Sequence, residues 1–159
     1  MGVSGSGKTV IGTLLARALG VDFVEGDTYH PPANIEKMSA GVPLTDFDRG
    51  GWLHAIGERI KRANDDGEGV VVSCSALKRS YRQIIRAEAG AVQFVFLRGE
   101  RALIGQRIRG RKGHFMPPSL LDSQFAALEE PSSEENIWIV DIDDSPEAIA
   151  ASLIARASA

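Results

Sequence analysis

The 159-residue sequence predicts an α/β protein of three layers, with helices on both faces of a parallel β-sheet. Short apolar runs are typical of strands buried on both faces, and Val70-Val71-Val72 is the most continuous of them. Helical segments alternate with these runs along the chain, which favours right-handed crossovers between parallel strands. The length indicates one domain over residues 1–159, with no repeat and no long linker.

Apolar spacing and helix-ending residues predict the elements in order. Apolar residues at positions 11, 14, 15, 18 and 19 predict a helix over 9–19 that Gly20 ends. The remaining elements are expected as a strand at 21–24, a helix at 34–40, a longer helix from 48 or 49 to a turn at 64–67, a strand at 69–73, a helix at 78–88, a strand at 93–97, helices at 101–109 and 117–128, a strand at 137–141 and a helix at 145–156.

The composition is that of an ordinary globular protein and disfavours several classes of function. A net charge of −3 and a pI near 5.6 give no general attraction to nucleic acid or to an anionic membrane. Cys74 has no second cysteine to pair with, which fits a reducing compartment. No apolar run approaches the ~20 residues that span a bilayer, and no signal peptide opens the sequence. We therefore expect a cytoplasmic enzyme.

Residues 2–9 form a complete phosphate-binding loop with the spacing Gly-x₄-Gly-Lys-Thr. In such a loop the backbone N–H groups surround the phosphates of a nucleotide, and the following helix directs its positive end toward them. Lys8 is expected to reach the β- and γ-phosphates, and the Thr9 hydroxyl to bind Mg²⁺. A chance Gly/Ser-rich turn is disfavoured because so many positions fit. The expected nucleotide contacts are Gly2, Val3, Ser4, Gly5, Ser6, Gly7, Lys8 and Thr9.

Only Met1 precedes this loop, whereas such a loop normally follows a buried strand. In a doubly wound sheet that strand lies near the centre, where each buried apolar side chain contributes ~1.5–3 kcal/mol. Losing three to five of them would remove an amount comparable to the whole stability of a domain, about 5–15 kcal/mol. We therefore expect the native protein to begin several residues upstream of Met1.

Two acids follow the first predicted strand, at the edge of the sheet where α/β proteins bind ligands. Glu25 and Asp27 are two residues apart, so in an extended segment their side chains project from one side. One carboxylate could hold Mg²⁺ through water while the other deprotonates an acceptor hydroxyl. The alternative is that both are solvated acids at a strand end. His30, ahead of two prolines, is either a substrate contact or a turn residue.

Two groups of basic residues carry further hypotheses. Lys78 and Arg82 share a helical face near a helix N-terminus, where they could receive a carboxylate, although a solvated basic surface is the alternative. The second group, broken by glycines, predicts a lid over about 107–118 that places cations on the transferring phosphoryl group. An RNA-binding patch is disfavoured because the chain is acidic and offers no stacking partner beyond Phe115. This group consists of Arg107, Arg109, Arg111, Lys112 and His114.

Taken together, these motifs resemble the gluconokinase family of P-loop sugar-acid kinases, relatives of shikimate kinase. The resemblance spans nearly the whole chain, and its blocks after the phosphate loop are more specific than the loop itself. The blocks are residues 2–9; Glu25-Gly26-Asp27-Thr28-Tyr29-His30-Pro31 with Asn34-Ile35-Glu36-Lys37-Met38; Pro43-Leu44-Thr45-Asp46-Phe47-Asp48-Arg49 with Trp52-Leu53; Cys74-Ser75-Ala76-Leu77-Lys78 with Tyr81-Arg82; and Arg111-Lys112-Gly113-His114-Phe115-Met116-Pro117-Pro118, continuing through Ser123-Gln124-Phe125.

The resemblance implies transfer of phosphate from ATP to D-gluconate, a homodimer, and a sheet of five parallel strands of which the strand before the phosphate loop is absent here. It implies Lys8, Asp27 and Arg111 as catalytic residues, and Arg107 with Arg111 as lid contacts to ATP. Its acceptor contacts would be Asp27, His30, Arg49, Lys78, Arg82 and His114, and its metal contacts Thr9 and, through water, Glu25.

The sequence departs from the family pattern at two places. Glu25 occupies a position where an aspartate is expected, and Gly50-Gly51 stands where a proline is more usual. The alternatives that remain are a kinase of another small hydroxy acid, such as shikimate, and a non-catalytic nucleotide-binding module.

Overall fold

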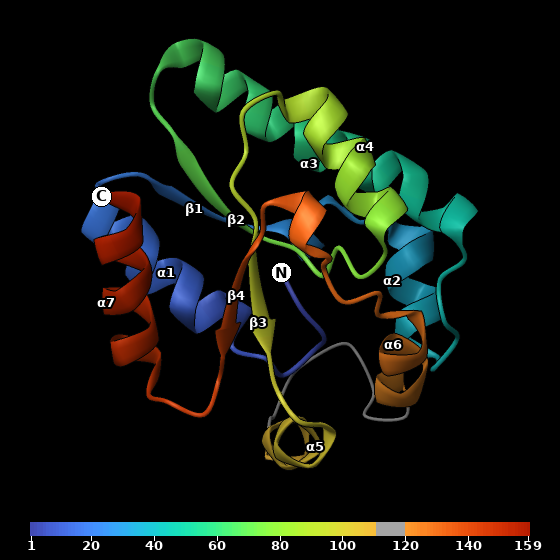
Figure 1. The fold of residues 1–159 in the computed structure, drawn as a ribbon. Coiled ribbons are helices and arrows are strands. Elements are labelled where there is room, and N and C mark those ends of the chain that lie inside the picture. Colours follow the sequence, from blue (N-terminus) through green and yellow to red (C-terminus); the bar gives the residue numbers. More distant parts are fainter. Residues whose placement is uncertain (111–119) are drawn as a thin grey trace.

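The computed structural model describes residues 1–110 and 120–159 (Figure 1). Along the chain the elements are α1 (Lys8–Leu19), β1 (Asp22–Glu25), η1 (Gly26–Tyr29), α2 (Pro32–Ser39), α3 (Asp46–Asp66), β2 (Val70–Ser73), α4 (Arg79–Ala89), β3 (Val95–Arg98), α5 (Arg101–Arg109), α6 (Leu121–Ala127), η3 (Ser133–Glu135), β4 (Trp138–Asp141) and α7 (Pro146–Ala157). Within these described ranges, no helix combines the length and the apolar character that crossing a membrane requires.

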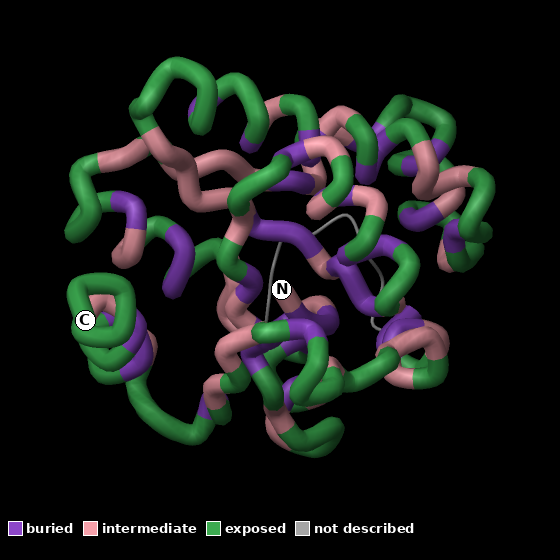
Figure 2. Tube along the Cα trace, turned by 45° about the horizontal axis from the view of Figure 1, so that its top comes forward, coloured by how far each residue is buried: buried purple, intermediate pink, exposed green. Residues whose placement is uncertain are grey.

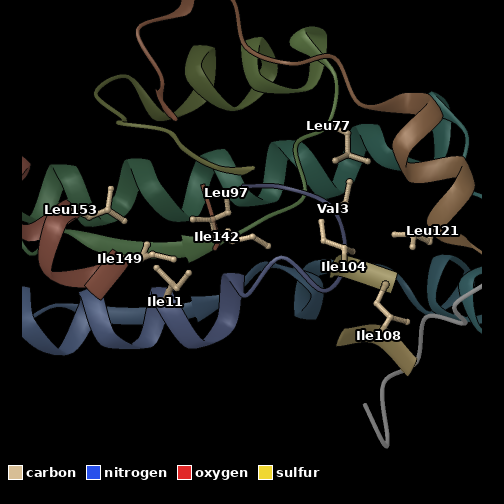
Figure 3. Packing of buried hydrophobic residues seen from close by; sticks show 10 residues of the cluster. All are labelled: Val3, Ile11, Leu77, Leu97, Ile104, Ile108, Leu121, Ile142, Ile149 and Leu153. Atoms are coloured by element: carbon tan, nitrogen blue, oxygen red, sulfur yellow. The ribbon is translucent and has the colours of Figure 1, made fainter. Parts of the chain in front are cut away.

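The strands form two parallel pairs with helices on either side, which confirms the predicted α/β class. Strand β1 pairs with β2, and β3 pairs with β4. Helices α1 and α7 pack together at the left in Figure 1, and α3 and α4 pack together at the top. Each helix pair has its own apolar core. The core beside α1 and α7 contains Ile11, Ile149 and Leu153 (Figure 3). That of α3 and α4 contains Trp52, Ile56 and Ile85.

The N-terminus lies near the centre of the molecule, as both ribbon and tube views show (Figures 1 and 2). The Leu97 N–H donates a 2.9 Å hydrogen bond to the Met1 carbonyl, and the Gly2 N–H donates to the Ser75 carbonyl at 3.1 Å. The Met1 amine donates to the Val95 carbonyl, and burial lowers its pKa to about 5. Met1 therefore continues the hydrogen bonding of a strand for a single residue.

A cavity of about 380 Å³ extends between β2 and β3. Its walls are mainly apolar and come from both strands and from the helices on both sides, with Ile11, Val72 and Val95 among them. The prediction that the strand before the phosphate loop is absent is therefore confirmed: residues 1–110 and 120–159 contain four strands, in two separate pairs, rather than the five of the family pattern.

Most predicted elements are present within a few residues of their expected ends. Helix α3 begins earlier than predicted because Thr45 caps it: the Asp48 N–H donates to the Thr45 hydroxyl, and the Thr45 N–H donates to the Asp48 carboxylate. The 3₁₀ helices η1 and η3 were not expected. Of the helix predicted at 117–128, α6 covers 121–127, and its first predicted residues lie outside the described ranges.

Candidate active site

The phosphate-binding loop curls at the N-terminus of α1, at the carboxyl ends of the strands. Gly5 and Gly7 have φ values of 81° and 92°, which favour glycine, and a Cβ on Gly5 would lie 2.8 Å from Ile108. Gly7 caps α1 without any side-chain hydrogen bond, and a helix N-terminus of this kind is suited to bind an anion. The Lys8 ammonium donates to the carbonyls of Gly2 and Val3 at 3.0 and 2.8 Å, which holds it across the loop.

Two further polar groups of the loop differ in their partners. The Ser6 hydroxyl is fully buried and has no hydrogen-bond partner within the described part of the chain. Ser6 does not line the cavity described below, whereas its neighbours Gly5 and Gly7 do. The Ser4 N–H donates a 2.6 Å hydrogen bond to the Gln124 side chain, so α6 is attached directly to the loop.

The two acids predicted to act together do lie at the edge of the site, but they have different surroundings. Glu25 accepts a 2.6 Å hydrogen bond from the Thr9 hydroxyl and another from the Ser73 hydroxyl. Asp27 lies in η1 and faces the cavity described below. Within the described ranges no cluster of three His, Cys, Asp or Glu residues could enclose a metal. Thr9 and Glu25 fit Mg²⁺, because this ion takes most of its ligands from phosphates and water.

Gly26, between these two acids, lets the chain pass close to β2. A Cβ added there would lie 2.0 Å from the Ser73 carbonyl oxygen, far inside contact distance. The Gly26 carbonyl in turn accepts a 2.8 Å hydrogen bond from the Trp52 indole. The direction of η1, and with it the placement of Asp27, therefore depends on the absence of a side chain at Gly26.

A cavity of about 350 Å³ connects the phosphate-binding loop to the acidic side of the site. Its volume suits a ligand of the size of a small organic acid together with a phosphoryl group. The walls combine loop residues with acids, a histidine and an arginine. The residues that line it are Ser4, Gly5, Gly7, Lys8, Thr9, Glu25, Asp27, Thr28, His30, Ile35, Met38, Arg49, Ser75 and Gln124.

His30 is a buried, neutral imidazole rather than a turn residue in solvent. Its ring stacks on Trp52 with centroids 4.1 Å apart and an 18° angle between planes. Burial, and secondarily the charge of Arg49, lowers the pKa of His30 to about 4. Nδ1 lies 3.3 Å from the Asn34 side-chain nitrogen and accepts its hydrogen bond, which leaves the proton on Nε2. Nε2 lies 3.9 Å from the Asp27 carboxylate, so its N–H faces the cavity beside the acid.

Arg49 and Lys78 were both predicted to contact the acceptor; both lie over the Tyr81 ring and line one smaller cavity, but only Arg49 also lines the main cavity. Arg49 lines the main cavity and also lies 5.6 Å above the Tyr81 ring. Lys78 lines a smaller adjoining cavity of about 140 Å³. There its ammonium donates to Asp46 at 2.8 Å, which lowers the pKa of that carboxyl. Lys78 is therefore beside the main cavity, and a ligand would have to compete with Asp46 for its charge.

Arg82 differs from its predicted role as an acceptor contact. Its side chain is 2% exposed and lines neither of the two cavities on this side of the molecule. The guanidinium instead forms a bidentate ion pair with Glu135. Lys78 caps α4 and Arg82 lies in the first turn of that helix, where its side chain points into the protein.

The predicted lid is described only in part. Arg107 is the last-turn residue of α5 that was expected to bind ATP, and its guanidinium donates a 3.0 Å hydrogen bond to the Ile142 carbonyl. It does not line the main cavity. Arg111 and His114 lie outside the described residues.

Sequence reasoning did not predict five residues of the cavity wall as site residues: Thr28, Ile35, Met38, Ser75 and Gln124. Gln124 lies 120 residues from its partner Ser4, so no local spacing reveals the contact. The only signal was its position in a block shared with the family pattern. Ser75 follows β2, and the rule that ligands bind at the carboxyl ends of strands could have identified it.

A parallel α/β fold with this loop, an acid opposite it and a connecting cavity defines a P-loop kinase of small molecules. A family model described as shikimate kinase matches residues 4–157. A gluconokinase of Gluconobacter oxydans is 46% identical over 154 residues, covering 97% of this chain and 86% of that protein. The thermosensitive gluconokinase of Escherichia coli is also 46% identical, over 90% of this chain and 77% of its own length.

Solved structures agree with these relatives. A gluconokinase from Sinorhizobium meliloti superposes with a TM-score of 0.85 at 50% identity, covering 99% of this chain and 90% of that one. A sugar kinase from Janibacter has a TM-score of 0.94 at 41% identity, over 99% of this chain and 91% of that one. The chain belongs to the gluconokinases, within the wider shikimate kinase family.

Proposed function

We propose that this protein transfers the γ-phosphoryl group of ATP to D-gluconate, giving ADP and 6-phospho-D-gluconate. The observation that supports this most directly is the single cavity that joins the phosphate-binding loop to Asp27, His30 and Arg49. It brings a phosphate donor site and a site for a hydroxylated anion into one space. The relatives called gluconokinase support gluconate as the acceptor.

The donor side follows from the loop. The N–H groups at the start of α1 bind the phosphates, and Lys8 exchanges its loop carbonyls for the β- and γ-phosphate oxygens. Mg²⁺, when bound through Thr9 and water-linked Glu25, would neutralise charge on the β- and γ-phosphates. Arg107, together with Arg111 from the segment that follows, completes the donor side of the proposal.

The acceptor side is built around Asp27. Its carboxylate takes the proton of the attacking hydroxyl as the new oxygen–phosphorus bond forms and the bond to the β-phosphate oxygen breaks, releasing ADP. The neutral His30 donates its Nε2–H to an oxygen of the sugar acid beside Asp27 and stays uncharged over the working pH range. Arg49 pairs with the carboxylate of the acid, and Lys78 and His114 are further proposed contacts.

A substrate panel tests this function. ADP release would be measured with gluconate, shikimate and other hydroxy acids at matched concentrations, with and without Mg²⁺. We expect gluconate to have the highest kcat/KM and turnover to require the metal. A preference for another acid would assign a different acceptor, and ATP binding without turnover of any acid would indicate a nucleotide-binding module.

The proposal includes a homodimer, as the resemblance implies. Phe47 is 95% exposed and Val42 48% exposed, and both lie near the start of α3. Apolar side chains this exposed are compatible with a partner surface. Light scattering after size-exclusion chromatography tests the dimer: a mass of twice 17.1 kDa is expected, and a monomer across a range of protein concentrations would refute it.

A further inference from the structure

A buried ion pair behind the acceptor cavity connects three segments that are distant in the sequence: α4, η3 and the loop of residues 74–78. Arg82 of α4 donates from Nε and Nη2 to the two carboxylate oxygens of Glu135 at 2.7 and 2.9 Å. Its third nitrogen, Nη1, donates to the carbonyls of Ala76 and Leu77 at 3.2 and 3.1 Å. All three guanidinium nitrogens are therefore engaged, and none is directed to a ligand.

The loop that Arg82 holds has an unfavourable conformation. Ala76 has a φ of 41°, in the left-handed region that a residue with a Cβ rarely adopts unless its surroundings hold it there. Ala76 is fully buried and Leu77 packs in the core with Val3. Two polar contacts thus secure the loop from behind while its side chains are fixed by packing.

The same loop forms part of the site. Ser75 lines the main cavity, and its carbonyl accepts the hydrogen bond from Gly2 that anchors the start of the phosphate-binding loop. Lys78, at the other end of the loop, caps α4 and reaches Asp46 in the adjoining cavity. A shift of the Ala76 and Leu77 carbonyls would therefore move a wall of the acceptor cavity.

Glu135 is itself held in place on several sides. Its carboxylate accepts a 3.2 Å hydrogen bond from the Ser132 N–H, and its backbone carbonyl accepts one from Arg86 at 3.1 Å. The hydrogen bond from Arg82 lowers the pKa of the Glu135 carboxyl, which keeps it ionised at neutral pH. A buried ion pair contributes little net stability compared with apolar side chains of the same size, because both charges lose their hydration. The role of this ion pair is therefore to position the segment that the Arg82 guanidinium binds, the carbonyls of Ala76 and Leu77.

We propose that Arg82 and Glu135 are positioning residues for the acceptor. They act through the carbonyls of Ala76 and Leu77, which hold Ser75 at the cavity wall and Lys78 at the start of α4. Neither residue contacts the substrate. The effect on gluconate rests on the proposed function, whereas the effect on the loop does not.

Two variants separate positioning from stability. R82K keeps a positive charge near Glu135, but one ammonium cannot reproduce the planar fork that reaches both the carboxylate and two carbonyls. R82M/E135L removes both charges together, so it leaves no unpaired buried ion. The matched control is R59K, because Arg59 of α3 pairs with Asp22 at 3.4 Å, at the opposite end of β1 from the site.

For R82K and R82M/E135L we expect the KM for gluconate to rise about tenfold or more and the KM for ATP to rise less, because the loop reaches the phosphate-binding loop through the single Gly2–Ser75 hydrogen bond. Amide hydrogen exchange at residues 75–78 should become faster in both variants. R59K should change none of these values. An equal rise in both KM values, or a gluconate KM that stays unchanged in both variants, would overturn the positioning role.

The exchange measurement keeps this result apart from the proposed function. If the unmodified protein does not phosphorylate gluconate, the function is refuted, yet faster exchange at 75–78 in R82K would still support the hold on the loop. Unchanged exchange there refutes that hold whichever acid is the acceptor.

Discussion

The carboxyl ends of the strands and the middle of the sheet differ sharply in how completely they are filled. At the carboxyl ends, Thr9, Glu25 and Ser73 are joined in one hydrogen-bonded group, and Trp52 supports both Gly26 and His30. Between β2 and β3 lies a mainly apolar cavity of about 380 Å³, at whose end Met1 bonds to β3 while Gly2 bonds to the Ser75 carbonyl after β2. The site is therefore built at the carboxyl ends of the strands, away from the cavity. Of the site's segments, only the phosphate-binding loop directly follows the residue that borders this cavity.

The largest expected effect comes from filling that cavity. A chain extended ahead of Met1 by Val-Ile-Val-Leu can pair with both β2 and β3 as a parallel strand. Burying about three of its side chains should raise the free energy of unfolding by about 5 kcal/mol. Denaturant unfolding measures this, with a Ser-Gly-Ser-Gly extension as the matched control. An equal gain from both extensions would show that the cavity does not accept a strand.

The second effect concerns the buried amine beside the same cavity. Burial lowers the pKa of the Met1 amine to about 5 in the folded state, from an ordinary value of 8.0. Between these two values the unfolded chain binds the proton and the folded chain does not, so stability should increase with pH from about 5 to 8. A three-unit shift corresponds to at most ~4 kcal/mol.

Unfolding by denaturant at several pH values measures this slope, after intact mass has confirmed that Met1 is retained. In the Val-Ile-Val-Leu extension the amine is replaced by a peptide N–H, so its contribution to the slope should vanish. The same slope in both proteins would assign the pH dependence to other groups.

The contrast between the two regions also marks what the sequence could predict. The phosphate-binding loop, the valine run of β2 and the acids after β1 are local patterns, and each was placed correctly. The role of Arg82 was predicted wrongly. Helical spacing shows that two residues share a face of a helix, but it does not show which of their side chains is buried. The contact between Gln124 and Ser4 depends on how distant elements pack, and it has no local signature.

A substitution at Gly26 tests how closely the segment after β1 packs against the end of β2. The Cβ of Gly26→Ala would meet the Ser73 carbonyl at 2.0 Å, so either β2 or η1 must move. We expect a loss of about 3 kcal/mol of stability together with weaker acceptor binding. Gly51→Ala is the matched control, because Gly51 lies within α3 with no atom near its Cβ position, and it should stabilise by about 0.5–1 kcal/mol. If both variants are equally stable, the close approach at Gly26 carries no strain.

The smallest change in structure, Asp27→Asn, tests the chemistry of the site. It replaces one carboxylate oxygen by an amide nitrogen and should leave the fold and ATP binding nearly unchanged. Without a base at this position, kcat should fall by about 10² or more, which corresponds to about 2.7 kcal/mol in the barrier. ATP affinity measured by calorimetry provides the control within the same variant. A parallel loss of ATP affinity would instead indicate that Asp27 holds the metal or the loop, and the role of proton acceptor would then have to pass to another group of the cavity.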